Sequence, residues 1–374
     1  MEIKNRFLLI FVCIFVAAVL IVGTTLGIIV GVRSAGAVVK YENVTMDQGT
    51  LNYIAAYYKM LYISSLRTAG ISASDTDNFW SSISPEGKTY GEHLEDGYRN
   101  YVSSLAVAAN IYLSNAKYTK DDKNKVSKAT EEILEYRADG SVSSFNKKAE
   151  KYSFNYKDFC NAASILYMAQ MAETIVYGAS GSNMSNYPDL CEEYLLEYSH
   201  VTLLFVNTVK EMTDEEREEK QKLIDMLKEA IEAKKTGASM QITPETIRKY
   251  LPESDGDPNM HDVGYYFHPK AEKTVEFASA FPEVVKESLS MELYDYSYVD
   301  CSVGVCFIYK WDNVSGAYKS NDNVFFSDFY QDASLYHFEK SLNLLSDEVT
   351  FGKKFDKIDI IKIPAISELF IKEF

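Results

Sequence analysis

One histidine in this sequence is placed where its side chain could take part in chemistry. His200 opens the run Ser199-His200-Val201-Thr202-Leu203-Leu204, which is rich in β-branched and apolar residues and follows a helical pattern. A strand that begins here carries an imidazole at one end of a sheet, and imidazole donates, accepts or moves protons near neutral pH. The competing interpretation is a solvated histidine at the start of a strand.

The remaining histidines and the five cysteines lack the spacing of a reactive or metal-binding site. His93, His261, His268 and His337 are scattered, and no cysteine pair forms C-x-x-C. The motifs G-x-S-x-G, H-E-x-x-H and the Walker loop do not occur. We therefore expect no metal and no cofactor. A short-loop disulfide between Cys301 and Cys306 remains open.

The composition predicts a folded chain whose negative charge disfavours binding to polyanions. With 374 residues, a 47% hydrophobic fraction and a 13% aromatic fraction, the chain is long enough for two domains and too apolar to be disordered. Its net charge of −16 disfavours nucleic acid and anionic lipid as partners of the soluble part. Extended polypeptides or small molecules are compatible ligands.

The first apolar run predicts a membrane anchor. Residues Phe7 to Val32 contain no charge, and at 1.5 Å per residue they can cross a hydrocarbon core of about 30 Å. A signal peptide cleaved near Ala37 is the alternative, but its apolar region is normally shorter. Lys4 and Arg6 place the N-terminus in the cytoplasm and the rest of the chain outside. We expect a single-pass membrane protein with an extracytoplasmic soluble part.

The apolar run also contains a spacing that suits contact between two membrane helices. Gly23, Gly27 and Gly31 recur every four residues, which lets helix backbones approach closely. A homodimer and a lone helix both remain open, because glycine is common in membrane helices.

Residues 41–198 read as a series of amphipathic helices with tyrosines on their apolar faces. Asp47 is a predicted N-cap, Thr119 with Asp122 caps another helix, and Pro188 opens the last one. The strand 200–206 and the capped helix from Thr213 begin a mixed segment. The patterns after it predict a short helix at Thr243-Pro244, a strand at 263–267, a helix at 274–289, and strands at 293–299 and 303–311.

This order of elements resembles the parvulin-type peptidyl-prolyl isomerase domain. The resemblance also rests on His200, on the strand Val263-Gly264-Tyr265-Tyr266-Phe267 and on the closing strand Gly304-Val305-Cys306-Phe307-Ile308-Tyr309-Lys310. The helices before and the helix and strand after it resemble the membrane-tethered SurA-like and PrsA-like foldases. In that family a parvulin domain is inserted into a helical chaperone region, to which the C-terminal segment returns.

The resemblance implies an α+β fold with four parts. Residues 1–40 would form the cytoplasmic stub, anchor and linker, and 41–198 the helical chaperone region. Residues 199–311 would form the parvulin-like domain with a four-stranded antiparallel sheet. Residues 312–374 would return to the chaperone region, with a helix at 325–345 and a strand at 357–363.

The resemblance also implies a set of site residues. His200 matches the first catalytic histidine, Cys306 stands where a second histidine is expected, and Asp255 is the nearest acidic candidate, with Glu253 and Asp257 as competitors. An apolar pocket for the proline ring would be formed by aromatic residues of the same region, Phe267, Phe277 and Phe281.

Two functions follow from these residues. In the first, a membrane-anchored extracytoplasmic foldase binds unfolded secreted chains and rotates X-Pro bonds, a reaction that needs no cofactor but must overcome a barrier of roughly 18–20 kcal/mol. In the second, the same protein binds polypeptides without catalysis, because cysteine is a poor hydrogen-bond partner in place of histidine. Convergence of His200 and Cys306 beside an open apolar pocket would favour the first function.

Overall fold

The chain folds into two compact units. A computed structural model describes residues 37–178, 182–235, 264–320, 323–367 and 369–370. Unit 1 contains the described residues before 180 together with those after 337, and unit 2 contains those between 180 and 337. Unit 1 is therefore built from two separate stretches of sequence, with unit 2 inserted between them. The fold is mixed α+β, as the sequence predicts.

The predicted membrane anchor lies outside the described residues. This holds for residues 7–32, for the three glycines Gly23, Gly27 and Gly31, and for the alternative cleavage site at Ala35-Gly36. Within the described ranges, no helix combines the length and the apolar character that crossing a bilayer requires.

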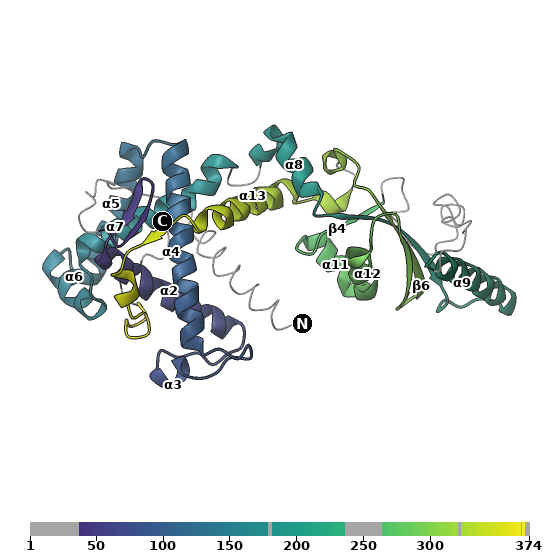
Figure 1. Ribbon diagram of the computed structural model, residues 1–374, viewed down its shortest axis with the longest axis horizontal. Coiled ribbons are helices and arrows are strands. Elements are labelled where there is room, and N and C mark those ends of the chain that lie inside the picture. The colour runs from purple at the N-terminus through teal and green to yellow at the C-terminus, as the bar shows by residue number, and fades with distance from the viewer. Residues whose placement is uncertain (1–36, 179–181, 236–263, 321–322, 368, 371–374) are drawn as a thin grey trace. The chain divides into compact units, whose positions relative to one another are not determined.

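Unit 1 is built around long helices whose starts the sequence predicts well (Figure 1). Asp47 accepts the Thr50 backbone N–H at the start of the first long helix, and Thr119 forms a capping box with Asp122. Each cap supplies acceptors for backbone N–H groups that have no partner inside the helix. The main helices are α2 (Gln48–Thr68), α4 (Tyr90–Asn115), α5 (Lys120–Ala138), α6 (Val142–Ala149) and α7 (Tyr156–Val176), and a short helix, α3, spans Asp77–Trp80.

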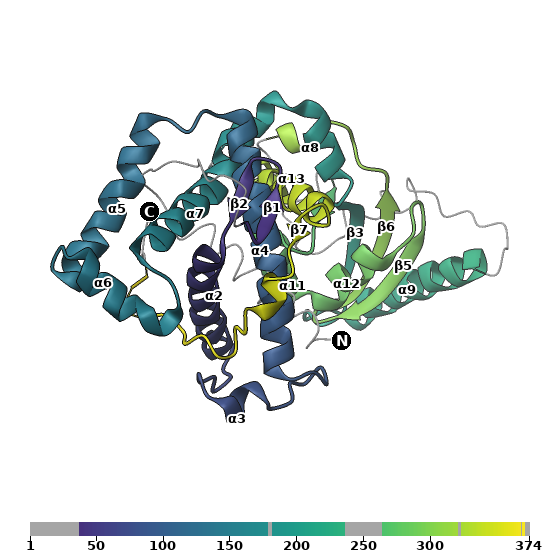
Figure 2. The ribbon, with the colours of Figure 1, turned by 60° about the vertical axis from the view of Figure 1, so that its left-hand side comes forward.

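The core of unit 1 is formed largely by aromatic rings, as the tyrosine-rich faces predict. Tyr58 of α2 stacks on Tyr101 of α4 with ring centroids 4.9 Å apart. Tyr53 meets Phe159 of α7 edge to face at 5.2 Å. These rings are almost fully buried, and α4 packs along α7 over much of its length (Figure 2). Large rings at the contacts allow a few helices to bury much apolar area.

A small sheet in unit 1 was not predicted from the sequence. Strands β1 (Val39–Tyr41) and β2 (Val44–Met46) form a hairpin, and β7 (Thr350–Phe351) adds antiparallel to β1. The expectation that 41–198 is nearly all helical is therefore wrong at its start. Strands of two or three residues leave too short a pattern to be recognised, and this sheet needs a partner more than 300 residues away.

The predicted strand at 357–363 is also wrong. We name residues 358–366 the C-terminal strap, because they run along α2 without regular secondary structure. Side chains and backbone of unit 1 take the hydrogen bonds that a sheet would have supplied. Lys59 Nζ donates to the carbonyls of Ile361 and Ile363 at 2.8 and 2.9 Å, and the Ile366 N–H donates to the Ala56 carbonyl at 3.1 Å.

Unit 2 contains a four-stranded antiparallel sheet with helices between its strands. Its order is β4-β3-β6-β5, so the first and last strands of unit 2, β3 and β6, pair at the centre. The predicted order of strands is confirmed for the described residues, while the helix at Thr243-Pro244 falls outside them. The strands are β3 (Ser199–Asn207), β4 (Tyr265–Phe267), β5 (Tyr296–Cys301) and β6 (Gly304–Trp311).

The helices of unit 2 differ from the prediction at one point. The helix expected at 274–289 is two helices, α11 (Glu272–Ala280) and α12 (Pro282–Ser290), and Pro282 is the first residue of the second. Proline lacks an N–H and is tolerated in the first turn of a helix but not in its interior. The other helices are α8 (Pro188–Leu195), α9 (Asp214–Lys235) and α13 (Phe329–Ser346), of which α13 begins in unit 2 and ends in unit 1.

The two faces of this sheet have different covers. Leu204, Val206 and Phe307 point to one face and pack with the apolar stripe of α9, which consists of Ile224, Leu227 and Ile231. The other face meets α11 and α12, where the Phe205 and Phe281 rings lie 4.9 Å apart. Because side chains alternate along a strand, residues separated by an odd number along β3 lie on different faces.

Candidate functional site

His200 is held in place by its own strand neighbours. It lies on the central strand β3 and is only 8% exposed. Its Nδ1 lies 2.8 Å from the carbonyl oxygen of Asp312, so Nδ1 carries the proton and donates it. The ring stacks flat on Tyr266, its partner on β4, with centroids 4.3 Å apart. The histidine therefore ties the end of β3 to the segment after β6.

Gly264 permits the close packing around His200. Its φ is +66°, and a Cβ added there would lie 2.6 Å from His200 Nε2. Only glycine takes this backbone conformation without strain and without filling that space. The ring is thus closely enclosed at the residue that precedes β4.

The structure does not bring His200 and Cys306 together. In the β3–β6 register His200 pairs with Trp311, whereas Cys306 pairs with Phe205. Five residues of strand separate the two positions, about 16 Å at 3.3 Å per residue, and five is an odd number, so the side chains lie on opposite faces. The expectation that Cys306 is the partner of His200 across the sheet is wrong, because the antiparallel register places Trp311 there.

The acidic candidates Asp255, Glu253 and Asp257 all lie outside the described residues. Cys306 is fully buried, and its thiol lies 3.8 Å from the Phe307 carbonyl. The disulfide left open between Cys301 and Cys306 is not formed, since both are free thiols.

The three aromatic residues expected to line a proline pocket do gather, but they fill the space themselves. The Phe277 ring lies 5.1 Å from Phe267 and 5.2 Å from Phe281. Phe267 is fully buried and also meets Phe325 edge to face at 5.4 Å. This cluster packs on the α11 side of the sheet, the side to which Cys306 and not His200 points. A bound proline ring would have to displace one of these side chains.

A cluster of titratable residues in unit 2 was missed by the sequence analysis. The His268 ring contacts the rings of Tyr198 and Tyr194, at 5.0 and 5.3 Å, and is 7% exposed. The first turn of α13 brings Asp332 near the same tyrosines. The members come from α8, the segment before β3, the β4–α11 turn and α13, so no local motif predicts them. The only sequence signal was a histidine directly after a strand rich in aromatic residues.

Burial shifts the pKa values of this cluster in opposite directions. It lowers the pKa of His268 to about 4, helped by the charge of Lys270 and opposed by Glu197. It raises the pKa of the Asp332 carboxyl to about 6, and the neighbouring carboxylate of Asp328 adds to that rise. Both groups are therefore stabilised in their neutral forms.

We expect Asp332→Asn to stabilise unit 2 at pH 7. The folded-state pKa of Asp332 lies above its usual value of 3.8, so the folded form binds more protons between about pH 4 and pH 6 and loses stability as pH rises through 6. Asparagine removes that loss. Allowing for partial exposure, the gain is about 1 kcal/mol at pH 7 and vanishes at pH 4. Chemical unfolding at both pH values measures it, and equal stability of the two proteins at pH 7 would contradict it.

One other group resembles a catalytic site but does not form one. Ser84 Oγ lies 2.9 Å from His93 Nε2, and the Glu86 carboxylate lies 3.7 Å from that same nitrogen. A serine–histidine–acid relay needs the acid on the other ring nitrogen, and Ser84 is buried. Among the described residues, no group of three or more His, Cys, Asp or Glu side chains is arranged to hold a metal ion.

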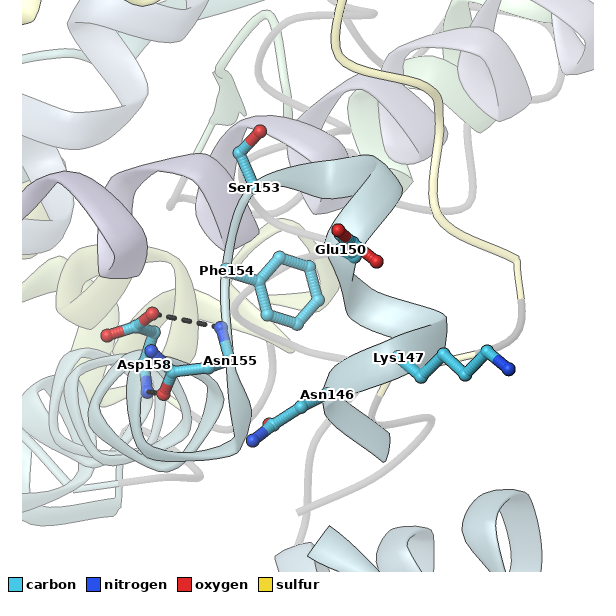
Figure 3. Close-up of a pocket in the computed structure, with 7 residues that line it drawn as sticks. All are labelled: Asn146, Lys147, Glu150, Ser153, Phe154, Asn155 and Asp158. Atoms are coloured by element: carbon cyan, nitrogen blue, oxygen red, sulfur yellow. Dashed lines mark hydrogen bonds between the residues drawn. The ribbon is translucent and has the colours of Figure 1, made fainter. Parts of the chain in front are cut away.

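An open surface cavity of about 610 Å³ lies in unit 1, beside the start of α7 (Figure 3). Asn155 caps α7 by accepting the N–H groups of Lys157 and Asp158, and the Asp158 carboxylate accepts the Asn155 N–H at 2.9 Å. These bonds complete the helix start and offer no pairing of nucleophile and base. The cavity is lined by Asn146, Lys147, Glu150, Ser153, Phe154, Asn155 and Asp158.

Comparison with solved structures gives weak likenesses, among them two PrsA proteins. No protein-family model matches the chain, and no curated protein matches it. The peptidyl-prolyl isomerase PrsA from Bacillus cereus is 15% identical, with a TM-score of 0.23, covering 74% of this chain and 93% of its own. PrsA from Bacillus subtilis is 12% identical, with a TM-score of 0.21, covering 73% and 92%. TM-scores this low support no conclusion about fold or function.

Proposed function

We propose that this protein is an extracytoplasmic folding factor that binds extended polypeptides and whose inserted unit does not isomerise proline bonds. The observation that carries the proposal is the arrangement of unit 2. It keeps the predicted order of strands, while His200 and Cys306, two of the residues expected to form the catalytic set, lie on opposite faces of the sheet. The aromatic side chains expected to receive a proline ring pack on each other.

The separation of His200 and Cys306 matters because isomerisation requires polar groups that meet at one pocket. A catalyst must bind the twisted amide more tightly than the planar one, in a dry pocket with polar groups aimed at it. His200 Nδ1 donates to the Asp312 carbonyl, and its ring is covered by Tyr266. The Cys306 side chain cannot reach the His200 ring, because the two side chains lie on opposite faces of the sheet.

Binding of a chain segment through its backbone has support within unit 1. The C-terminal strap contains a turn and no regular secondary structure, and its backbone is bound by Lys59, by the Ala56 carbonyl and by Asp75. Backbone contacts do not depend on sequence, which suits a protein that must accept many clients. We further propose that residues 7–32 anchor the chain in the membrane with unit 1 and unit 2 outside, and that Gly23, Gly27 and Gly31 pair two such anchors.

The test is proline-limited refolding measured beside aggregation. We expect the purified chain to leave the refolding rate of a proline-limited client within about twofold of the uncatalysed rate, because the barrier of roughly 18–20 kcal/mol is untouched. We expect it to suppress aggregation of a denatured client at stoichiometric concentration. A His200→Asn variant, which can keep a donor at the δ position, should behave like the parent in both assays.

Two results would count against the proposal. Acceleration that His200→Asn abolishes would establish catalysis through His200. No effect of the parent on aggregation would remove the folding-factor function itself.

A further inference from the structure

His268 organises the turn that leads from β4 into α11. Its backbone N–H donates to Thr274 Oγ1 at 3.1 Å, and its carbonyl accepts the Ala271 N–H at 3.1 Å. Its ring Nδ1 accepts the backbone N–H of Lys270 at 3.3 Å. Three of the bonds that shape this turn thus belong to one residue.

The bond to Nδ1 exists only while the imidazole is neutral. A backbone N–H is always a donor, so Nδ1 must present a lone pair to receive it. A protonated imidazole carries hydrogen on both nitrogens and accepts at neither. Protonation of His268 therefore breaks the Lys270 bond and sets two donors against each other.

The other buried histidines described in unit 2 behave in the opposite way. His337 Nε2 lies 2.8 Å from the Leu190 carbonyl, and His200 Nδ1 lies 2.8 Å from the Asp312 carbonyl. Carbonyl oxygens only accept, so both rings donate, and they go on donating in the charged form. The bond that His268 accepts from Lys270 is therefore lost on protonation, whereas the bonds of His200 to Asp312 and of His337 to Leu190 are kept.

The surroundings of His268 provide little support for a positive charge. Its ring is enclosed by Tyr194 and Tyr198, which come from α8 and the segment before β3. Lys270 repels a charged imidazole, and Glu197 attracts it. Asp328 and Asp332 lie near the same tyrosines, and burial favours the neutral form of Asp332.

The turn holds the helix that covers the aromatic face of the sheet. Phe277 of α11 packs on Tyr265 at 5.4 Å and on Phe267 at 5.1 Å. Phe281, directly after α11, packs on Phe205 at 4.9 Å. If the turn opens, α11 loses its attachment to β4, and this apolar face becomes accessible.

We propose that His268 is an acid-sensitive latch: its protonation opens the β4–α11 turn and releases α11 from the aromatic face, while the central β3–β6 pair stays formed. The inference does not depend on the proposed function. It concerns unit 2 alone.

The direction and size of the pH effect on turn opening follow from the difference in the pKa of His268 between the closed and the open turn. The pKa of His268 is about 4 in the closed turn and about 6.5 in an exposed histidine, so the latch is fully closed above pH 6.5 and weakens as pH falls toward 4. Between pH 7 and pH 5 the equilibrium constant for opening should rise about twentyfold. Asp332 has the opposite sign, because its protonation near pH 6 stabilises the folded form.

Hydrogen exchange of the full chain tests the latch. After correction for the intrinsic pH dependence of exchange, we expect protection in α11 to fall about twentyfold from pH 7 to pH 5, with protection in β3 and β6 unchanged. In a His268→Asn variant, whose side-chain oxygen can still accept the Lys270 N–H, α11 should show no such fall. A His337→Gln variant, which keeps a donor at the ε position, should behave like the parent.

Three results would overturn the inference. They are an equal fall in α11 protection in the parent and in His268→Asn, a simultaneous loss of protection in β3 and β6, and no fall at all in the parent. Should His268→Asn fail to fold, the ring nitrogens of His268 in the parent can be titrated by NMR. Titration near pH 6.5, or a proton on Nδ1 at pH 7, would equally overturn it.

Discussion

Lys59→Met should lower the free energy of unfolding of unit 1 by about 3 kcal/mol, because it removes one partner from a buried ionic network. Lys59 is 1% exposed, and its Nζ lies 2.5 Å from Asp75 Oδ1. Burial lowers the pKa of Lys59, and Asp75 opposes that shift. Methionine matches the length and the apolar stem of lysine, so the change isolates the ammonium group.

The network joins three parts of the chain. Besides Asp75, the ammonium group binds the carbonyls of Ile361 and Ile363 in the C-terminal strap. Asp75 in turn accepts from the Trp80 indole N–H and from the Ala365 N–H. Loss of the ammonium leaves a carboxylate without its counter-charge and two carbonyls without their donor, and each lost partner adds to the cost.

The matched control is Lys88→Met. Lys88 pairs with Asp96 at 2.8 Å, but both side chains are more than half exposed, so its removal should lower the free energy of unfolding far less than Lys59→Met does. Guanidinium unfolding monitored by tyrosine fluorescence compares the two variants. Limited proteolysis should also cut the strap sooner in Lys59→Met. Similar stability losses in the two variants would show that the buried network does not hold the strap.

Gly304→Ala should destabilise unit 2 by about 3 kcal/mol or more, because the added methyl group meets backbone on a central pair of strands. Gly304 opens β6 with a φ of +139°, a conformation that side chains disfavour. A Cβ there would lie 2.3 Å from the Val206 carbonyl oxygen and 2.8 Å from the Thr208 nitrogen. Neither atom can move without opening the β3–β6 ladder.

Gly316→Ala is the control that separates the strain of a positive φ from the clash of an added Cβ with neighbouring backbone. Gly316 also has a positive φ, +75°, but its nearest neighbours are atoms of the flexible Lys319 side chain at 3.7 Å. Its replacement should cost only about 1 kcal/mol, the ordinary cost of a side chain in a left-handed conformation. Thermal unfolding followed by circular dichroism ranks the two variants. Gly304→Ala with a stability equal to Gly316→Ala would contradict the β3–β6 register described above.

The sequence predicts the local features of this fold well. The caps at Asp47 and Thr119, the helix start at Pro188 and the strands around His200 and Phe307 all lie where their patterns indicate. Each of these signals depends on residues within a few positions of one another, so the chain encodes them without reference to the rest of the fold. The order of elements in unit 2 follows from the same local patterns.

The arrangement of the candidate site depends on contacts that a local pattern does not contain. A one-residue change of register moves a side chain to the other face of a sheet, and the register of β3 on β6 joins residues about 100 positions apart. The sequence therefore names His200 and Cys306 as candidates but not the sheet that lies between them.

Long-range packing also produced two features that no sequence motif predicts, the binding of the strap and the cluster around His268. The strap is held by Lys59 from some 300 residues away, and His268 meets Tyr194 of α8, more than 70 residues before it. The sequence by itself determined where helices and strands begin and which faces are apolar. Only the tertiary structure decided which side chains meet, because the energy of a buried polar group or a stacked ring depends on neighbours brought in by folding.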